Sequence, residues 1–352
     1  MRMGIIVNDL FTEEDDYTTT ALAMAAVNRG HEVWYIDVDA FALRPDDHTY
    51  AHAWPVPGSR HRSGRAFLKD VRKHAQGGRI EIDLHTLDVL MPRNDPSLDA
   101  VSRPWARAAA INFSRLALRA GVLVLNDPDG LNLGLNKLYM QYFPDSIRPR
   151  TLITRDKREA KDFIAAEGGY AILKPLAGSG GRSVFLVQPY DTPNVNQMLD
   201  AVARDNYFIV QQFLEDAIHG DTRLFMLNGR PFQVQGKYAA IHRQRRTGDA
   251  DIRSNLTAGA RPLRAEVTEK TLAVAEQTGP RLRQDGIFLA GLDIVGDKIM
   301  EINVQSPGGL PSAEAFEGVP FAAEIVRAIE RKLAYRAQHP TMAGNAELAV
   351  WE

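Results

Sequence analysis

The segment from Phe288 to Asn303, FLAGLDIVGDKIMEIN, sets acidic and amide side chains at alternate positions within an apolar run. Apolar residues fill the even positions on both sides of a central turn, whereas Asp293, Glu301 and Asn303 fall at odd ones. Because side chains alternate faces along a strand, this pattern predicts two strands that share one apolar face. The other face would carry two carboxylates and an amide, which are ligands that suit Mg²⁺.

The turn at Gly296-Asp297 determines which residues of the two strands pair. A two-residue loop would pair Asp293 with Met300 and set the two acids on opposite faces. A three-residue loop, from Gly296 to Lys298, pairs Asp293 with Glu301 and keeps Met300 on the apolar face. The apolar pattern favours the three-residue loop. An ordinary hairpin with a polar outer face is the alternative to a metal site.

A second segment, YAILKPLAGSGGRSVFLV from Tyr170 to Val187, predicts a strand, a glycine loop and a second strand. It is not a Walker A loop, which needs Gly-Lys-Ser/Thr leading into a helix, and no helix follows to make a dinucleotide fingerprint. Glycines let backbone N–H groups close on phosphate oxygens, and Lys174 adds a positive charge. Together with the acidic hairpin, this loop indicates a phosphate site rather than a plain glycine-rich turn.

The composition fits a soluble globular enzyme, because 45% of the residues are hydrophobic and 24% are charged. At 352 residues, the chain is long enough for two or three modules. A net charge of −2 argues against nucleic acid as the main partner. The absence of cysteine excludes a disulfide framework, a cysteine-ligated zinc site and a thiol nucleophile, and the histidines show no metal-ligand spacing. The N-terminus reads as a strand rather than a signal peptide, so we expect a cytoplasmic protein without a membrane segment.

Strand, helix and strand alternate at the N-terminus, in the runs Met3–Val7, Thr18–Arg29 and Glu32–Val38. This order predicts a domain built on a parallel sheet. Residues 44–65 are rich in proline, histidine, arginine and glycine, and predict a loop or hairpin excursion. A later apolar run, Leu87–Met91, leads into a polar loop at the C-terminal edge of a strand, where ligands bind in open α/β sheets.

From residue 126 the pattern changes to a helix followed by antiparallel strands. The segment Gln244–Ser254 is polar and contains glycine, so we expect a mobile loop. The run Phe321–Ala334 predicts a final helix, and residues 336–352 predict a loose tail.

These motifs resemble the bacterial glutathione synthetase branch of the ATP-grasp ligases, and the correspondence spans most of the chain. The motifs around the glycine loop and the acidic hairpin are the most specific. The supporting motifs are GIIVND near the N-terminus, Arg93-Asn94-Asp95-Pro96, Asn126-x-Pro128, Lys137, VQQFL at Val210–Leu214, GDTR at Gly220–Arg223 and RSNLTAGAR at Arg253–Arg261.

The resemblance implies an α/β chain with a Rossmann-like, pre-ATP-grasp N-terminal domain, residues 1–125, that binds substrate. An ATP-grasp fold of two α+β subdomains should follow. Residues 126–205 would hold the glycine-rich phosphate loop, residues 206–335 the Mg²⁺ site, and residues 336–352 a flexible tail. ATP should lie between the two subdomains, and the acceptor peptide between them and the N-terminal domain.

The resemblance also implies roles for individual residues. Contacts with ATP are expected from Lys137, Lys174, Gly178, Ser179, Gly180, Gly181, Gln211, Gln212, Phe213, Leu214 and Asp221, of which Gln211 to Leu214 should face adenine. Two Mg²⁺ ions, or Mn²⁺ in their place, should bind Asp293, Glu301 and Asn303. Catalysis should depend on Arg223, near the transferred phosphoryl group, and on Asn255, near the tetrahedral oxyanion. Substrate contacts are expected from Arg93, Ser254, Ser306, Gly308 and Gly309.

Several of these assignments have structural alternatives. Lys137 would otherwise be a solvated helix lysine, Gln212 an exposed strand residue, and Arg223 the ion-pair partner of Asp221. The region of the predicted mobile loop is longer and more basic than in the family, with Arg243 directly before the loop and Arg245 and Arg246 within it. Those arginines would either bind a substrate carboxylate or form a solvated loop.

The chain departs from the family pattern after Ser306-Pro307. The family continues there with threonine, cysteine, isoleucine, arginine and glutamate, whereas this chain has Gly308-Gly309-Leu310-Pro311-Ser312. The glycines keep a backbone nest, but the arginine that would meet a substrate carboxylate is missing. The nucleotide half of the site is therefore better specified than the acceptor half.

The implied activity is ATP-dependent ligation of a carboxylate to an amine through an acyl phosphate, most simply of γ-glutamylcysteine to glycine. A ligase for another dipeptide or amine is the first alternative. A non-catalytic ATP-binding protein of the same fold is the second. We expect small peptide and amino-acid substrates and a homo-oligomer.

Overall fold

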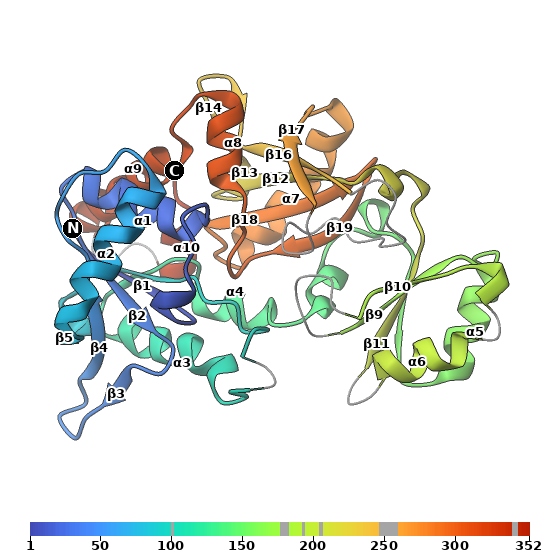
Figure 1. Ribbon diagram of the computed structural model, residues 1–352, viewed down its shortest axis with the longest axis horizontal. Coiled ribbons are helices and arrows are strands. Elements are labelled where there is room, and N and C mark those ends of the chain that lie inside the picture. Colours follow the sequence, from blue (N-terminus) through green and yellow to red (C-terminus); the bar gives the residue numbers. More distant parts are fainter. Residues whose placement is uncertain (100–101, 177–182, 192–193, 204–206, 246–259, 340–343) are drawn as a thin grey trace.

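The computed structural model describes residues 1–99, 102–176, 183–191, 194–203, 207–245, 260–339 and 344–352. Within these ranges the strands form three main sheets and a two-stranded ribbon. Figure 1 shows the first sheet at the left, the second at the right, and the third between and above them.

The first sheet has the order β3-β4-β2-β1-β6-β7, with β5 paired to β4. Strands β2, β1, β6 and β7 are parallel, which confirms the predicted parallel sheet. The predicted excursion is a hairpin, because β3, β4 and β5 pair antiparallel at one edge. The strands are β1 Arg2–Val7, β2 Glu32–Asp37, β3 Phe41–Leu43, β4 Thr49–Pro55, β5 Ile80–Asp83, β6 Val89–Pro92 and β7 Leu123–Val124. The helices that pack on it are α1 Thr18–Asn28, α2 Gly64–His74 and α3 Ala106–Arg119.

The second sheet is antiparallel, with the order β10-β9-β11-β8. Its last strand, β11, pairs with both β8 and β9, so this unit extends beyond residue 205, where the sequence suggested its end. The strands are β8 Thr151–Thr154, β9 Ala171–Pro175, β10 Phe185–Val187 and β11 Phe208–Gln212. The helices are α5 Lys157–Ala166 and α6 Val195–Ala203.

The third sheet has the order β17-β16-β12-β18-β19, with β13 paired to β12. Its strands are β12 Asp221–Leu227, β13 Arg230–Pro231, β16 Ala240–Gln244, β17 Arg261–Arg264, β18 Leu289–Val295 and β19 Lys298–Asn303. The ribbon consists of β14 Gln233–Val234 and β15 Lys237–Tyr238. The remaining helices are α4 Pro128–Leu133, α7 Glu269–Gln284, α8 Leu310–Glu317, α9 Phe321–Gln338 and α10 Asn345–Val350.

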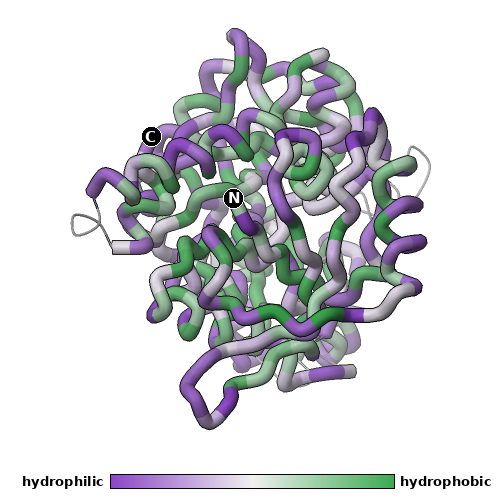
Figure 2. Tube along the Cα trace, turned by 90° about the vertical axis from the view of Figure 1, so that its left-hand side faces the viewer, coloured by the Kyte–Doolittle hydropathy of each residue, from purple (hydrophilic) through white to green (hydrophobic). Residues whose placement is uncertain are grey.

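The first and third sheets share one hydrophobic core. Ile5 of β1 and Leu22 of α1 belong to the same buried cluster as Phe288 and Ile325. At the surface of this junction, Arg29, which caps the C-terminal end of α1, forms a salt bridge with Glu330 of α9, with 2.6 Å between Nη2 and Oε2. Figure 2 shows hydrophobic segments running through the middle of the molecule. The second sheet has a separate core, formed with α5 and α6.

The expectation of a loose tail is wrong for residues 344–352. Helix α10 buries Leu348 and Ala349, and Trp351 stacks on Tyr335 with 4.0 Å between ring centroids. The carbonyl of Trp351 also accepts a hydrogen bond from the ammonium of Lys332, which is 1% exposed. Lys332 Nζ also donates to Asn228 Oδ1 at 2.9 Å, so this buried amine links the end of the chain to the residue after β12.

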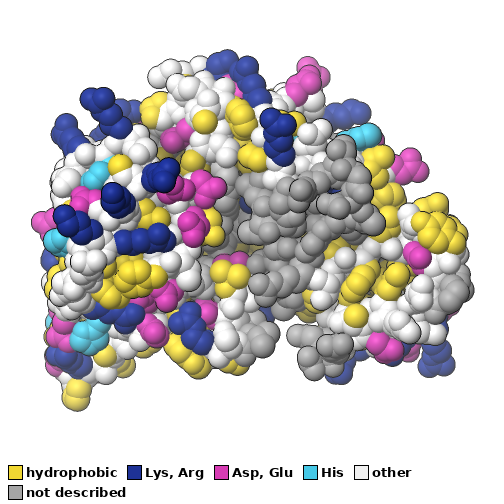
Figure 3. Space-filling view, in the orientation of Figure 1, with side chains coloured by type: hydrophobic (Ala, Val, Ile, Leu, Met, Phe, Trp, Pro, Cys, Tyr) yellow, Lys and Arg dark blue, Asp and Glu magenta, His cyan; other side chains and the backbone are white. Residues whose placement is uncertain are grey.

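Charges of both signs are interspersed over the N-terminal domain on the face drawn in Figure 3. Among the described residues, each helix is too short or too polar to cross a membrane.

Candidate active site

The hairpin of β18 and β19 carries the predicted acidic residues. Asp293 pairs with Glu301 across the two strands, which confirms the expected pairing. The expected three-residue loop is wrong, because Val295 pairs with Lys298 and leaves a loop of two residues. The register shifts beside Asp293, so Met300 is the extra residue of a β-bulge.

The bulge exchanges the positions of two apolar side chains. Ile299 is buried in the core beneath the hairpin, where Met300 was expected. Met300 instead lines the pocket next to Glu301. Bulges commonly redirect side chains beside functional sites, and this one adds an apolar wall to a polar pocket.

Asp293 is 1% exposed and is held by two arginines. Arg223, which is opposite Asp293 in the register of β12 and β18, donates from Nε to Oδ1 at 2.7 Å and from Nη2 to Oδ2 at 2.8 Å. Arg243 Nη2 lies 2.7 Å from Oδ2, and Asn303 Nδ2 donates to Oδ2 at 3.2 Å. Burial alone would raise the pKa of Asp293, but Arg223 and Arg243 outweigh burial and lower that pKa.

A second buried ion pair adjoins the first. Arg243 is opposite Asp221 in the register of β12 and β16 and donates two hydrogen bonds to its carboxylate, at 2.7 and 2.8 Å. Burial alone would lower the pKa of Arg243, but Asp293 and Asp221 outweigh burial and raise that pKa. The buried cluster contains two carboxylates and two guanidinium groups, so the side-chain charges on neighbouring strands cancel. Its members are Asp221, Arg243, Asp293 and Arg223.

These pairs correct one expectation and one of the structural alternatives. Arg243 lies in β16 and is buried, so its assignment to a mobile loop is wrong. The carboxylate that holds Arg223 in a two-bond pair is Asp293, whereas Asp221 forms the corresponding pair with Arg243. Asp221 and Arg223 are two residues apart, so they lie on the same face of β12. Two opposite charges on one face of a buried strand indicate that each has an oppositely charged partner on a neighbouring strand.

Lys174 lies in β9 and is positioned by two side chains. Its Nζ donates to Gln211 Oε1 at 2.9 Å, and Gln211 Nε2 donates to Thr151 Oγ1 at 2.9 Å. The Gln211 side chain, expected near adenine, therefore orients the lysine. Burial and the nearby charge of Lys137 lower the pKa of Lys174 to about 8, although its side chain keeps some solvent contact. A phosphate placed here would stabilise the charged form of the lysine.

Lys137 begins a short 3₁₀ helix, Lys137–Tyr142, rather than lying inside a longer α-helix. Asn136 caps this helix by accepting a backbone N–H of its first turn. The backbone N–H of Lys137 donates to the Leu176 carbonyl at 3.1 Å, which ties the helix to the second sheet. Lys137 Nζ lies 3.9 Å from Glu301 Oε1 on the third sheet. Lys137 thus spans the space between the two sheets.

A pocket between the second and third sheets brings together part of the predicted site. The predicted residues that line it are Lys137, Lys174, Gln211, Glu301, Asn303 and Ser306. Asp95, Pro96 and Ser97 reach it from the loop after β6, at the C-terminal edge of the parallel sheet. Lysines on one wall and oxygen ligands on the other suit a polyphosphate with a bound cation.

The residue types on the pocket wall fit Mg²⁺. Glu301 and Asn303 line the pocket, and the Glu301 side chain is half-buried. Asp293 is outside the described lining, and both of its oxygens accept hydrogen bonds from arginines. An Mg²⁺ ion would therefore bind Glu301 and Asn303 directly, and would share an Asp293 oxygen with a guanidinium.

The loop from Ser306 to Gly309 connects the pocket to the N-terminal domain. Arg93 Nη2 donates to the Pro307 carbonyl at 3.2 Å, and Arg223 Nη1 donates to the Gly308 carbonyl at 3.3 Å. The two arginines therefore hold the loop from opposite sides. Arg93, expected to contact substrate, is buried and contacts this loop.

Glu13 is a buried residue beside Arg93 that belongs to none of the sequence motifs. Its side chain is close enough to Arg93 for their charges to interact, and among the described residues its Oε2 has no hydrogen-bond partner. Burial raises the pKa of Glu13 from 4.5 to about 7, and Arg93 partly opposes that rise. The acidic run Glu13-Glu14-Asp15-Asp16 directly before α1 is the signal that could have indicated it.

Replacing Glu13 with glutamine should change how stability depends on pH. The folded pKa is raised, so the contribution of Glu13 is fully present below pH 4.5 and is lost as the pH rises through about 7. The shift corresponds to about 3 kcal/mol of unfolding free energy. Urea unfolding at pH 5 and pH 8 should show this loss in the unsubstituted protein and not in Glu13→Gln. Equal pH dependence of stability in the two proteins would contradict a raised pKa of Glu13 in the folded state.

Other predicted residues lie away from the pocket or outside the described residues. Gln212 is half-buried and its Oε1 accepts from the Arg150 N–H at 3.2 Å, while Phe213 stacks on Tyr170 at 6.3 Å. Neither they nor Leu214 belong to the described lining. The predictions for Gly178, Ser179, Gly180, Gly181, Ser254 and Asn255 concern residues outside the described ranges.

Comparisons with known proteins agree with this arrangement. Residues 1–132 match the family described as "Prokaryotic glutathione synthetase, N-terminal domain", and residues 136–318 match "Prokaryotic glutathione synthetase, ATP-grasp domain". A glutathione synthetase of Agrobacterium fabrum is 33% identical over 322 residues, which cover 90% of this chain and 91% of that one. A glutathione synthetase of Gloeobacter violaceus is 32% identical over 331 residues, covering 93% and 95%.

Solved structures with the same fold are more distant in sequence. The D-cycloserine synthetase DcsG superposes with a TM-score of 0.63 at 17% identity, covering 94% of this chain and 99% of that one. The ATP-grasp ligase PsnB, in complex with its minimal precursor, Mg and ADP, gives a TM-score of 0.52 at 16% identity, covering 94% and 98%. With both family matches together spanning most of its length, the chain belongs to the prokaryotic glutathione synthetase family and has the ATP-grasp fold.

Proposed function

We propose that this protein joins γ-glutamylcysteine to glycine in an ATP-dependent reaction that passes through an acyl phosphate. The observation that carries this proposal is the convergence of Lys137, Lys174, Glu301 and Asn303 on one pocket, in a chain of this family. A carboxylate is a poor electrophile, so ATP must first convert it to an acyl phosphate. The amine then displaces phosphate and forms the peptide bond.

The first step needs charge neutralisation and alignment more than a protein nucleophile. Lys174, held by Gln211, would neutralise phosphate oxygens on the side of the second sheet, and Lys137 would do so from between the two sheets. We propose that two Mg²⁺ ions bind on the side of the third sheet, where Glu301, Asn303 and Asp293 would hold them. When bound, Mg²⁺ supplies positive charge to the phosphate oxygens. Mn²⁺ suits the same oxygen ligands.

The acceptor substrate would lie on the other side of the loop from Ser306 to Gly309. Arg223 donates to this loop and to Asp293, so it is placed between the cation ligands and the acceptor side. There it would stabilise negative charge on the transferred phosphoryl group. Ser254 and Asn255, proposed to contact the substrate and the oxyanion, follow β16 in the chain.

A ligase with a different dipeptide or amine is the second candidate, and one observation favours it. Where the family has cysteine and arginine, this chain has Gly309 and Pro311, and the carbonyl of the preceding Gly308 is already bonded to Arg223. A substrate carboxylate would therefore meet backbone N–H groups or Arg93 instead of the missing arginine.

A phosphate-release assay with ATP and Mg²⁺ distinguishes the candidates. ADP formation that requires both γ-glutamylcysteine and glycine is the expected result. Dependence on another γ-glutamyl dipeptide or amine would select the second candidate. Nucleotide binding without turnover on any pair would contradict a ligase function.

We further propose that the protein acts in the cytoplasm on small peptide and amino-acid substrates, and that it is a homo-oligomer. Light scattering coupled to size-exclusion chromatography tests the oligomeric state, and a monomer across the micromolar range would contradict it.

A further inference from the structure

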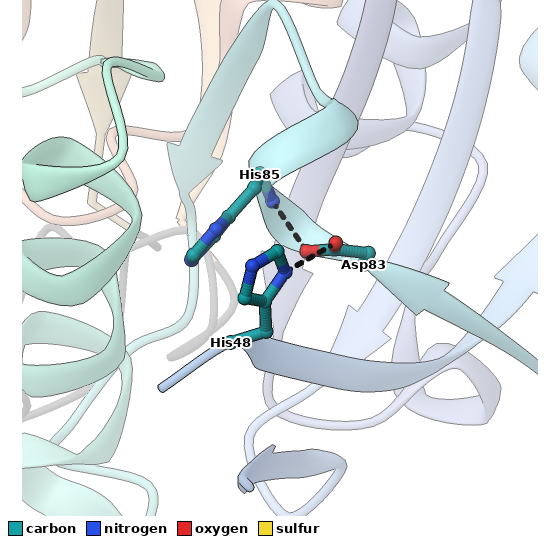
Figure 4. A group of neighbouring side chains, drawn as sticks. All are labelled: His48, Asp83 and His85. Atoms are coloured by element: carbon teal, nitrogen blue, oxygen red, sulfur yellow. Dashed lines mark hydrogen bonds and ion pairs between the residues drawn. The ribbon is translucent and has the colours of Figure 1, made fainter. Parts of the chain in front are cut away.

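Three potential metal ligands meet on the N-terminal domain, away from the pocket. His48 lies in the turn before β4, Asp83 ends β5, and His85 follows in the 3₁₀ helix Leu84–Thr86 (Figure 4). The antiparallel pairing of β4 with β5 brings them together, because it places Tyr50 opposite Asp83. The three residues are outside the described pocket lining, so the proposed ligase reaction does not use them.

The geometry of this group is compact. His48 Nδ1 and Asp83 Oδ2 are 2.8 Å apart, and one potential ligand atom from each of the three residues lies within 4.8 Å of the others. The two imidazole rings lie against each other in Figure 4, with centroids 4.4 Å apart and planes inclined by 32°. Among the described residues, this is the one group of three or more histidines and acids that meets this criterion.

Asp83 is already oriented by the backbone. Its Oδ1 accepts the His85 N–H at 2.9 Å, which caps the short helix and leaves Oδ2 facing His48. The Thr86 hydroxyl adds a 2.7 Å hydrogen bond to the Asp83 carbonyl. A carboxylate held in this way directs one oxygen at the site, as the partners of metal ligands do in established sites.

The site is open to solvent, since the His48 side chain is 46% exposed and that of Asp83 is 22% exposed. An ion can therefore reach it without a channel. The tilted rings must turn for their nitrogens to converge on one ion, and an exposed histidine can rotate at low cost.

We propose that His48, Asp83 and His85 bind one first-row transition-metal cation of the Zn²⁺ class. Two imidazoles and one carboxylate are typical protein ligands of such ions, with water in the fourth position. Mg²⁺ prefers an all-oxygen shell, so the ion that accompanies ATP is not expected to compete. The bound cation would tie the turn between β3 and β4 to the end of β5, at the edge of the first sheet.

The test uses the full-length, untagged protein, treated with chelator and then dialysed. Titration with Co²⁺, without nucleotide, should produce visible d–d absorption bands that saturate at one equivalent. Zn²⁺ should abolish those bands and raise the midpoint of thermal unfolding by several degrees, because it binds the folded state preferentially. Millimolar Mg²⁺ should change neither signal.

Variants assign the ligands. His48→Ala and His85→Ala should each weaken Co²⁺ binding by at least about tenfold, and Asp83→Asn should do so while keeping the cap on the short helix. His52→Ala is the matched control, because His52 is an exposed histidine on the same strand, β4, and should leave affinity unchanged. None of these residues belongs to the proposed ligase site, so turnover with ATP should persist in all four variants.

Absence of Co²⁺ binding to the unsubstituted protein would overturn the proposal. So would unchanged affinity in His48→Ala and His85→Ala, which would leave His48 and Asp83 as an ordinary surface ion pair. If a variant does not fold, NMR of the unsubstituted protein identifies the ligands instead. Zn²⁺ must then shift the imidazole signals of His48 and His85 and leave the imidazole signal of His52 unchanged.

Discussion

Asp293→Asn is expected to lower turnover by about a hundredfold or more and to destabilise the fold by about 3–5 kcal/mol. The loss of stability follows from the two guanidinium groups of Arg223 and Arg243, both bonded to this carboxylate in a buried site. An amide cannot supply the lost negative charge, so Asp221 alone would face two buried guanidinium groups, and one uncompensated buried charge is costly. Urea unfolding and phosphate release, measured on the same preparation, give both quantities.

Glu301→Gln is the matched control, because it also removes a predicted Mg²⁺ ligand from this hairpin. Glu301 is half-buried and its nearest lysine, Lys137, is 3.9 Å away, so the loss of stability should stay below about 1 kcal/mol. Turnover should still fall by about a hundredfold. Equal losses of stability in the two variants, or full activity in either, would contradict these roles.

Lys174→Met is expected to weaken ATP binding and turnover together by about 10²–10³-fold. Methionine keeps an unbranched apolar stem but removes the charge that Gln211 directs into the pocket. Stability should not fall greatly, because burial already disfavours that charge, as the lowered pKa of Lys174 shows. Calorimetric ATP titration and steady-state kinetics measure the two effects.

The same lysine should make ATP binding take up protons. Its pKa is about 8 before phosphate arrives, so about half of the molecules are neutral at pH 8, and phosphate favours the charged form. Calorimetry in two buffers of different ionisation enthalpy should show uptake of up to about half a proton at pH 8. Lys174→Arg should show none from this position, because arginine is always charged. Uptake that persists in Lys174→Arg would assign it to another group.

The sequence predicted the pairing of the acids but not the means by which the chain achieves it. Strict alternation required Asp293 opposite Glu301, and a three-residue loop or a two-residue loop with a bulge satisfies that requirement equally. The choice depends on whether Met300 or Ile299 fits the core, which is a packing property that alternation alone does not contain.

Other features depend on contacts between distant segments. Arg243 looked like part of a basic loop, and only its register with Asp221 on β12 shows that it is buried and paired. His48 and Asp83 are 35 residues apart, and the pairing of β4 with β5 makes them neighbours. The end of the chain has an ordinary composition, and its fixed position depends on the burial of Leu348 and Ala349 and on the contacts of Trp351 with Tyr335 and Lys332. Local pattern predicts elements, whereas such contacts require the tertiary structure.

The distribution of the hydrophobic cores has a mechanical consequence. Since the first and third sheets share a core, they should move together as one rigid body. The second sheet has a core of its own, so it should be the lobe that rotates relative to them. The two strands that connect this lobe to the rest run side by side, because the Gln212 N–H donates to the Arg150 carbonyl at 2.8 Å. Both connecting segments therefore form a single hinge. Rotation of the lobe about this hinge should move Lys174 away from Glu301 and let nucleotide enter and leave.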